Sequence, residues 1–474
     1  MKSNRKAALA AALAAFIFAG CGLYKPVGGT EPAEETTAPV TDTTAAQTAL
    51  TTDTAAPQTE TTAAPAEDYA ALLGEMTAGA DTKLPLSEDF FRWLEKYTRD
   101  TALLGNMYAE ITKGGFSDKR FTELSGLTVH AAHDLYTGVA EAADNIHVLD
   151  GDGKAGISMT FGGDISFADN WHVMEYMKTT EHGLGDCISA FLMSKMQTAD
   201  IAALNNEFCF SDRGDPLPGK MWTFRAATKN VKYYDELGID IVDLANNHCY
   251  DYGEVAFIDT LETLERAGLP YMGAGRNIKE ASKPQYFIVE GKKIAFVAAT
   301  RAEKYVLTPE ATDLTPGVLR CYEPDAFIEV IKEAKENADF VIANLHWGTE
   351  DSHDLEPEQT STARLYIDAG ADLIVGAHAH CLQGVEFYKH VPIIYNLGNF
   401  WFSEYDIDTG LLGVTLKEDN SLDLVFYPAT QRDCKTTYVG GEAEGERILR
   451  NMRSYSLNAD FDKDGVITET QTAN

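Results

Sequence analysis

The sequence is short of positive charge. Its 474 residues include 39 Lys and Arg against 73 Asp and Glu, which gives a formal charge of −34 at pH 7. Nucleic-acid phosphates bind basic surfaces, so this balance argues against a nucleic-acid-binding protein. It also argues against a broad attraction to any other polyanion.

The sequence also lacks cysteine motifs. None of its 7 cysteines forms a CxxC pair, and their spacing matches no zinc finger. An exported protein could pair them, but a domain of this size does not need disulfides. We therefore predict buried free thiols at the six positions after Cys21: Cys187, Cys209, Cys249, Cys321, Cys381 and Cys434.

The apolar run at the N-terminus is too short to span a bilayer. Residues 7–19 are apolar and follow three basic residues, as in a signal peptide. Phe18-Ala19-Gly20-Cys21 resembles a bacterial lipobox, in which the cysteine is lipidated, although Phe18 departs from the usual Leu or Val. We predict a lipoprotein signal peptide over residues 1–20 and an extracytoplasmic protein anchored to the membrane through Cys21. Secretion without an anchor is the alternative.

Large apolar residues are almost absent from residues 21–67, which are rich in Thr, Ala, Pro and Glu. Such a segment cannot bury enough surface to offset its ordering entropy, so we predict a disordered linker. Residues 68–150 then show helical spacing, with Ser87 and Ser117 as N-caps and Gly114-Gly115 as a stop. We predict a small helical module here. His130 and His133 lie one turn apart in it, but we interpret them as structural because no further ligands join them.

Strands and helices alternate through residues 156–470, which predicts a layered α/β domain with helices outside. Apolar strands are predicted at residues 157–161, 201–204, 241–244, 293–299, 340–345, 373–377 and 393–397, followed by a strand pair at 411–416 and 422–427. Helices are predicted at residues 231–237, 257–267, 327–337 and 358–369. At the C-terminus, Lys463-Asp464-Gly465 predicts a β-turn into a last short strand, rather than a calcium loop.

Polar residues follow five of these strands directly. They are Asp164, Glu207, Asn247 with His248, His346, and His378 with His380. The carboxyl ends of strands in α/β sheets are where ligands bind, and these groups offer only oxygen and nitrogen donors. The set therefore predicts a site for one or two divalent ions such as Mn²⁺, Fe²⁺ or Zn²⁺. A single Asp in a turn or a single His near a strand end would more often be structural, but five such ends are hard to explain that way.

The ordered set of motifs resembles the bacterial capsule-synthesis CapA family, which is associated with poly-γ-glutamate. The resemblance covers residues 156–428 and is carried by Phe161-Gly162-Gly163-Asp164, Asn206-Glu207, Leu244-Ala245-Asn246-Asn247-His248 with Asp251-Tyr252-Gly253, His346-Trp347-Gly348-Thr349-Glu350, Gly376-Ala377-His378-Ala379-His380 and Tyr395-Asn396-Leu397-Gly398-Asn399-Phe400. It implies a domain similar to calcineurin-type metallophosphatases, with an α/β/β/α sandwich.

The resemblance also implies a role for each polar residue. Asp164 and His380 would hold a first metal ion and Glu207 would bridge. The second ion would be held by Asn247, His346 and His378. His248 would act beside the site as a proton donor or a stabiliser of the transition state. Arg225, Asp251, Glu350 and Asn399 are further candidates for substrate binding.

Two residues depart from the metallophosphatase pattern. Ser166 stands where those enzymes have a histidine, and Glu207 replaces the bridging aspartate. The second metal position is therefore the firmer prediction.

We expect a CapA-like protein that acts on an anionic envelope polymer or its precursor, with capsule synthase subunits as further partners. Metal-activated water would attack a phosphoester or a γ-glutamyl amide. The alternatives are a non-catalytic accessory subunit of a polymer synthase and a general metal-dependent phosphodiesterase.

Overall fold

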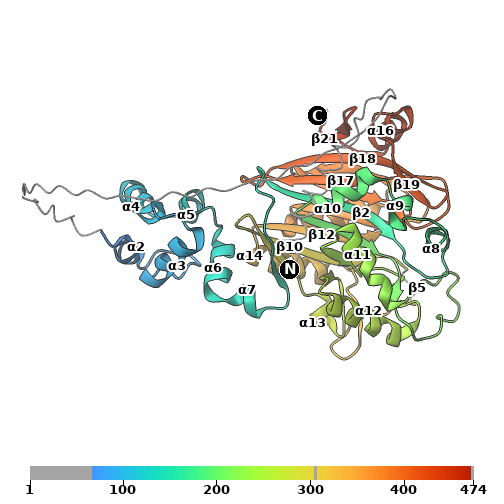
Figure 1. Ribbon diagram of the computed structural model, residues 1–474, viewed down its shortest axis with the longest axis horizontal. Helices are drawn as coiled ribbons and strands as arrows, with labels where there is room; N and C mark the ends of the chain where they lie inside the picture. Colours follow the sequence, from blue (N-terminus) through green and yellow to red (C-terminus); the bar gives the residue numbers. More distant parts are fainter. Residues whose placement is uncertain (1–66, 304–306, 471–474) are drawn as a thin grey trace, which may run out of the picture.

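The computed structural model describes residues 67–303 and 307–470 (Figure 1). The predicted signal peptide, Cys21 and nearly all of the predicted linker lie outside the described residues. Within the described residues, no helix is long and apolar enough to cross a membrane.

Two β-sheets stacked face to face form the centre of the protein (Figure 1). The first contains, in order, β1 (Ile146–Val148), β9 (Gln285–Val289), β10 (Lys292–Thr300), β12 (Phe340–Trp347), β13 (Leu373–His378), β15 (Val391–Leu397) and β14 (Leu382–Tyr388). The second contains β20 (Ala459–Phe461), β21 (Val466–Glu469), β18 (Leu422–Arg432), β17 (Ile407–Leu416), β2 (Ile157–Ile165), β3 (Ile201–Asn206), β6 (Ile241–Asp243) and β7 (Tyr271–Met272). Two further strands join it, because β16 (Asn399–Trp401) pairs with β2 and β19 (Lys435–Tyr438) pairs with β18.

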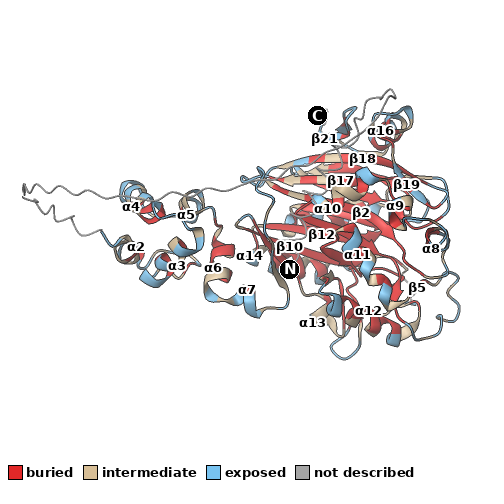
Figure 2. Cartoon of the chain, in the orientation of Figure 1, coloured by how far each residue is buried: buried red, intermediate tan, exposed pale blue. Residues whose placement is uncertain are grey.

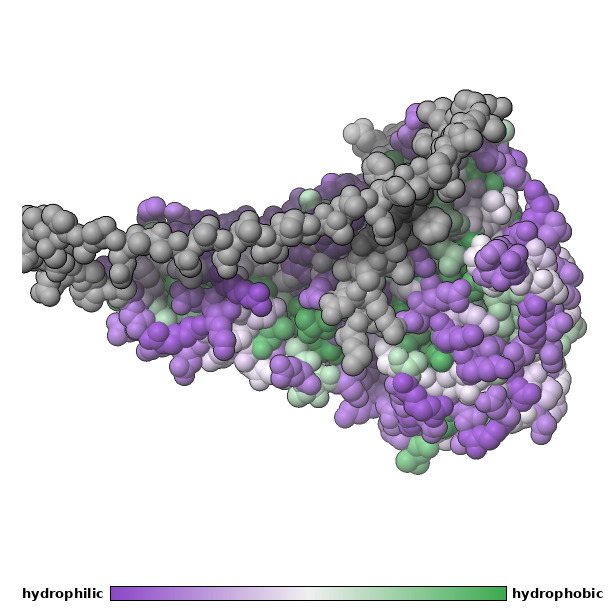
Figure 3. Space-filling view, in the orientation of Figure 1, coloured by the Kyte–Doolittle hydropathy of each residue, from purple (hydrophilic) through white to green (hydrophobic). Residues whose placement is uncertain are grey.

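Helices cover the outer face of each sheet. The first sheet is covered by α14 (Asp325–Asn337) and α15 (Pro357–Ala369). The second is covered by α8 (His172–Met177), α9 (Leu184–Cys187), α10 (Ala190–Thr198), the 3₁₀ turn η1 (Thr228–Val231), α11 (Lys232–Leu237) and α12 (Gly253–Ala267). Buried residues fill both sheets (Figure 2), while the surface seen in Figure 3 is largely hydrophilic. The predicted layered α/β sandwich is confirmed.

The continuous apolar runs of the sequence follow from burial on both faces of the strands. In β3, Ala202 and Leu204 pack with the helices, whereas Ile201 and Ala203 pack between the sheets. Side chains alternate across a strand, so a strand covered on both sides has no polar face.

The central strands run parallel, and their carboxyl ends therefore meet at one end of the sandwich. In the first sheet, Thr300 of β10 is level with His346 of β12, which is level with Ala377 of β13. In the second sheet, β2 runs parallel to β3, and β3 to β6.

The helical module comprises α2 (Tyr69–Thr77), α3 (Glu88–Thr98), α4 (Leu103–Gly114), α5 (Asp118–Ser125), α6 (Val129–Thr137) and α7 (Val139–Ala142). The predicted caps are present, because Ser87 Oγ accepts from Phe90 N at 3.2 Å and Ser117 Oγ accepts from Arg120 N at 3.2 Å. The predicted stop is confirmed at Gly114, where α4 ends.

Polar contacts join the module to the sandwich. Thr128 N donates to Gly291 O at 2.8 Å, and Thr128 Oγ1 donates to Asp339 Oδ2 at 2.6 Å. His130 Nδ1 lies 2.9 Å from Asp339 Oδ1, in agreement with a structural histidine. The chain then enters the first sheet directly, because β1 pairs with β9.

Several smaller elements were not predicted from the sequence. They are β1, β7, β9, β14, β16, β19, β20, α8, α9, α10, α13 (Ile278–Ala281), α16 (Ala443–Tyr455), and the two short pairs β4 (Cys209–Phe210) with β5 (Arg225–Ala226) and β8 (Ala274–Gly275) with β11 (Gly317–Val318). The predicted last turn is confirmed as the β20–β21 hairpin, in which Asp462 Oδ1 accepts from Asp464 N and Val466 N. The six described cysteines are buried and free, as predicted.

Candidate metal centre

All six predicted metal ligands lie at the carboxyl ends of central strands. Asp164 is in β2, Glu207 directly follows β3, and Asn247 is in the loop after β6. The other three come from the first sheet and are His346 in β12, His378 at the end of β13, and His380 two residues later. The two sheets therefore supply one cluster together.

A close backbone approach explains the glycine before Asp164. A Cβ atom at Gly163 would lie 1.8 Å from Gly398 O, so only glycine fits there. The gap lets Asp164 N donate to Gly398 O at 3.0 Å, which joins β2 to the turn between β15 and β16. That turn leads into Asn399, whose Oδ1 lies 2.7 Å from His380 Nδ1.

Glu207, His346 and His378 form the most compact part of the cluster. One ligand atom from each lies within 4.8 Å of the others, and all three residues are buried. His346 Nε2 lies 3.4 Å from Glu207 Oε1 and 2.8 Å from Asn247 Oδ1. This half corresponds to the predicted second metal position.

Asp164 and His380 form the other half. His380 Nδ1 lies 3.2 Å from Asp164 Oδ2. The Asn205 amide joins the halves, because its Nδ2 donates to Asp164 Oδ1 at 2.7 Å and also to Glu207 Oε2. Asn246 Nδ2 donates to Asn205 Oδ1 at 3.0 Å and so fixes the orientation of that amide.

Three atoms of the cluster are buried without a hydrogen-bond partner among the described residues. They are Asp164 Oδ2, Glu207 Oε1 and His378 Nδ1. Buried polar atoms are almost always hydrogen-bonded, whereas Asp164 Oδ2 and Glu207 Oε1 have only ion-pair contacts, with His380 Nδ1 at 3.2 Å and His346 Nε2 at 3.4 Å. A bound ligand would satisfy all three atoms. Divalent transition metals bind oxygen and imidazole nitrogen donors, so the residues of the cluster fit such an ion.

The charges of the cluster shift its pKa values in opposite directions. Burial would raise the pKa of Glu207, but His346, His248 and His380 hold it well below its ordinary value. Burial would lower the pKa of His380, but Asp164 raises it to about 10. Burial and the neighbouring imidazoles lower the pKa of His378, which is therefore neutral, the form that binds metal.

Two predicted ligands have left-handed backbone conformations. The φ angles are 97° at His378 and 54° at His380. Such angles are costly for residues other than glycine and concentrate at functional sites. The ring centroids of these two imidazoles lie 6.1 Å apart.

His248 lies beside the cluster and is oriented by Asp251. Its Nδ1 lies 2.8 Å from Asp251 Oδ2, and its Nε2 lies 3.9 Å from Glu207 Oε1. Because a carboxylate only accepts, Nδ1 carries the hydrogen and Nε2 faces the cluster. Asp251 is itself held by Phe224 N at 2.6 Å and Lys220 Nζ at 2.9 Å.

The predicted substrate-binding residues occupy different surroundings. Asp251 is fully buried and contacts His248, and Asn399 contacts His380. Arg225 donates to Gly214 O at 2.8 Å and lies over the ring of Tyr252, whereas Glu350 is exposed in the turn after β12. Their contact with a substrate stays a prediction.

Ser166, which replaces the expected histidine, is fully buried outside the ligand cluster. Its Oγ accepts from Ala168 N at 3.3 Å, which stabilises the turn after β2. Three other residues beside the predicted ligands were not predicted from the sequence: Asn205, Lys220 and Glu303. Asn205 could have been found because it lies two residues before Glu207 on the same strand end. Lys220 and Glu303 lie in loops without a motif.

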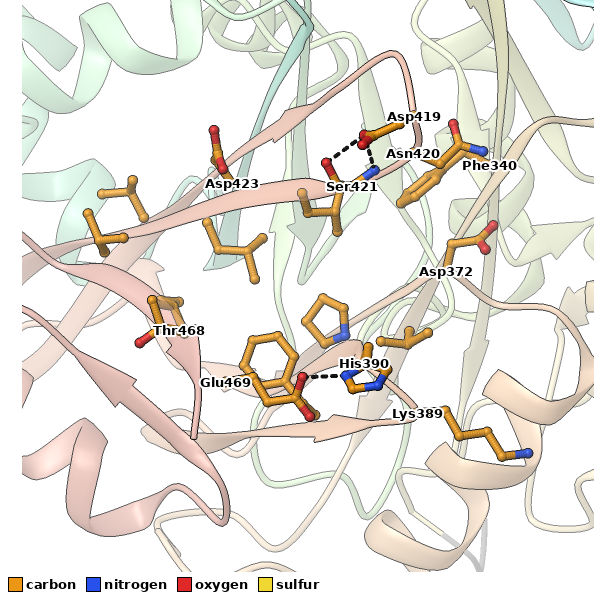
Figure 4. A pocket seen from close by; sticks show the side chains of 18 residues that line it. Phe340, Asp372, Lys389, His390, Asp419, Asn420, Ser421, Asp423, Thr468 and Glu469 are labelled. Carbon is orange, nitrogen blue, oxygen red and sulfur yellow. Dashed lines mark hydrogen bonds and ion pairs between the residues drawn. The ribbon is translucent and has the colours of Figure 1, made fainter. Parts of the chain in front are cut away.

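A groove of about 920 Å³ lies away from this cluster, between the starts of β12 and β15 and the strands β18 and β21 (Figure 4). Its polar rim includes Asp372, Lys389, Asp419 and the pair His390–Glu469, whose Nδ1 and Oε2 lie 2.7 Å apart. The predicted ligands are not among its lining residues. The groove therefore lies at the opposite ends of the central strands from the predicted ligands.

Comparison with known proteins identifies the family. The family described as bacterial capsule synthesis protein PGA_cap matches residues 158–404, more than half of the chain. The chain belongs to this family. All six predicted ligands, His248 and the four candidate substrate-binding residues lie inside the matched PGA_cap region.

Relatives with assigned names support this membership. The capsule biosynthesis protein CapA of Bacillus anthracis is 35% identical over 234 residues, covering 48% of this chain and 56% of that protein. The PGA biosynthesis protein CapA of Bacillus subtilis (strain 168) is 33% identical over 251 residues, covering 52% and 64%. A probable polyglutamine synthesis accessory protein of Mycobacterium tuberculosis (strain H37Rv) is 28% identical over 210 residues, covering 42% and 55%. The chain thus spans between about half and two thirds of the length of these curated relatives.

Proposed function

We propose that this PGA_cap protein acts in the synthesis, export or trimming of an anionic envelope polymer of the poly-γ-glutamate type. The similarity to the two Bacillus CapA proteins supports this proposal, and the matched PGA_cap region contains the cluster. The proposed location is outside the cytoplasmic membrane, with Cys21 as a lipid anchor. Capsule synthase subunits are the proposed protein partners.

The proposed activity is metal-dependent hydrolysis of a phosphoester or a γ-glutamyl amide, in a metallophosphatase-like domain. The observation that carries it is the set of open, buried ligand atoms on Asp164, Glu207 and His378. His346, His378 and Asn247 would hold one Mn²⁺, Fe²⁺ or Zn²⁺ ion, Asp164 and His380 would hold another, and Glu207 would bridge them. A bound divalent ion supplies activation of water and stabilisation of developing negative charge.

His248 would act as a proton donor or would stabilise the transition state. Its Nδ1–H bond to Asp251 leaves Nε2 directed at the cluster, where it can hold a proton for a leaving group or stabilise an oxyanion. The ring of Phe224, with its centroid 4.7 Å from that of His248, excludes water from one side of the imidazole. A locally dry site strengthens these electrostatic effects.

An accessory role without catalysis is the second candidate. Ser166 supplies no imidazole to the first metal position, and its hydroxyl is used by the backbone. The name of the Mycobacterium tuberculosis relative includes the words accessory protein. The overall charge of −34 would also repel a polyanionic substrate unless metal ions create a local positive region.

The two candidates differ in the effect of one substitution. The full-length protein, loaded with Mn²⁺ or Zn²⁺, would be incubated with poly-γ-glutamate and, separately, with a chromogenic phosphodiester. The hydrolase proposal predicts product release that His248→Ala reduces strongly. Equal rates for the two proteins would favour the accessory role.

A further inference from the structure

Between β9 and β15, the first sheet contains the strands β10, β12 and β13. Of these three, only β10 supplied no predicted ligand. Glu303 follows the end of β10 by three residues and has a left-handed φ of 50°. Arg320 holds this conformation, because its Nη1 donates to Glu303 O at 3.3 Å and its Nη2 donates to Thr308 O at 2.6 Å. A held left-handed glutamate at the edge of a cluster suggests a function for its side chain.

The Glu303 carboxylate faces the side-chain amide of Asn247. Asn247 Nδ2 donates to Glu303 Oε1 at 3.4 Å, and Asn247 Oδ1 lies 2.8 Å from His346 Nε2. An asparagine amide can turn over without changing its shape, so its neighbours decide which end faces a metal. Because a carboxylate cannot donate, Glu303 requires the nitrogen on its own side and places the oxygen on the side of His346.

Lys220 holds both partners of this hydrogen bond. Its ammonium donates to Asn247 O, lies 3.6 Å from Glu303 Oε1, and lies 2.9 Å from Asp251 Oδ1. The Lys220 side chain is 5% exposed, so these charges interact strongly. Thr308 Oγ1 also donates to Asn247 O at 2.7 Å, and the main chain of Asn247 is therefore fixed from two loops.

We propose that Glu303 is a positioning residue for metal binding, which fixes the oxygen of the Asn247 amide toward His346, while Lys220 fixes Glu303 and the Asn247 backbone. This inference rests on the proposed metal site and deepens it. Glu303 contacts no metal in this scheme. Without Glu303, the side-chain amide of Asn247 flips, and its NH2 group instead of its oxygen faces the metal position.

The test is a set of Mn²⁺ titrations by calorimetry on the full-length protein after treatment with a chelator. Glu303→Ala should weaken Mn²⁺ binding by about 10- to 100-fold, the usual effect of removing a residue that orients a ligand. Glu310→Ala is the matched control, because it removes the same charge from an exposed position seven residues later. It should leave the affinity within about twofold of wild type, since Glu310 lies outside the set that holds the amide.

A second set of variants, made in a protein that carries Asn247→Asp, distinguishes the orientation of the Asn247 amide from the charge of Glu303. Asn247→Asp replaces the amide by a carboxylate, whose two oxygens make orientation irrelevant. In this background, Glu303→Ala should no longer weaken Mn²⁺ binding, because the double-mutant cycle removes the interaction being tested. If Glu303→Ala does not fold, Glu303→Gln takes its place in both backgrounds, with a smaller loss expected in the first.

Each result has one meaning. Wild-type affinity in the Glu303 variant, or an equal loss in both backgrounds, would overturn the positioning role. A wild-type protein that binds neither Mn²⁺ nor Zn²⁺ would instead overturn the proposed metal site itself. A loss confined to the asparagine background supports the inference.

Discussion

Two regions of this protein bury charged groups, and they differ in how completely those groups are paired. At the junction of the helical module with the sandwich, Lys293 contacts Asp134, and Asp339 accepts from Thr128 and contacts His130. At the carboxyl ends of the central strands, Asp164, Glu207 and His378 each keep a buried atom without a hydrogen bond among the described residues.

The difference separates a structural role from a functional one. A buried charge costs free energy unless it is paired, and the junction follows this rule. In the strand-end cluster, three buried atoms have no hydrogen bond among the described residues, and two of them, Asp164 Oδ2 and Glu207 Oε1, have only an imidazole ion pair. We therefore propose that the strand-end cluster is a binding site, while the fully paired groups of the junction stabilise the contact between two parts of the chain.

We expect His248→Ala to affect the reaction and not the fold. We expect the rate of hydrolysis to fall by about 10²- to 10⁴-fold, the usual contribution of a proton-transferring side chain. The Mn²⁺ affinity should change little, because His248 is not a ligand in this account. Rate measurements and metal titrations on the same preparation check both expectations. A large loss of metal binding would make His248 a ligand instead.

Lys293→Met should destabilise the fold and leave metal binding unchanged. It leaves Asp134 buried without its cation, which costs about 3–5 kcal/mol in the free energy of unfolding. Denaturant unfolding measures this loss, and metal titration of the folded variant should give the wild-type affinity. The double variant with Asp134→Leu should recover much of the stability, because the unpaired charge is gone.

Metal ions should stabilise the wild-type protein through the cluster alone. At a free concentration 100 times the dissociation constant, binding adds about 2.7 kcal/mol to the free energy of unfolding. Thermal unfolding with Mn²⁺ and with a chelator measures the shift. His378→Ala should remove it, and a shift of the same size in that variant would place the binding site elsewhere.

The smallest expected effect is a pH dependence at the junction. Burial would raise the pKa of Asp339, but the hydrogen bonds from His130 and Thr128 lower it below the ordinary 3.8. Asp339 therefore contributes stability above its unfolded pKa, and this contribution is lost as the pH falls through its lower folded pKa. Asp339→Asn should reduce the difference in unfolding free energy between pH 6 and acidic pH. An unchanged difference would mean that other carboxyl groups cause the acid sensitivity.

The sequence revealed the fold because the central strands are buried on both faces. Runs such as residues 340–345 and 373–377 stand out for that reason, and the cluster follows because their polar ends meet where parallel strands stop. The short pairs β4–β5 and β8–β11 could not be predicted. They contain two residues each, and their pairing depends on the surrounding tertiary structure.

The surroundings of the ligands were harder to predict than the ligands. Lys220 and Glu303 lie 83 positions apart in loops, and the chain brings them together only through the packing of two sheets. Asp251 was predicted only as a candidate for substrate binding, and its contact with His248 was not foreseen. Residues that orient others have no spacing rule, because their partners come from distant strands.

The most direct measurement of the central claim is the number of metal ions bound per chain. The full-length protein would be dialysed against Mn²⁺ or Zn²⁺, and the bound metal would be counted by elemental analysis beside His346→Ala and Lys293→Met. The account predicts at least one ion per wild-type chain, the same number in Lys293→Met, and a clear loss in His346→Ala. A folded wild-type protein without stoichiometric metal would contradict it.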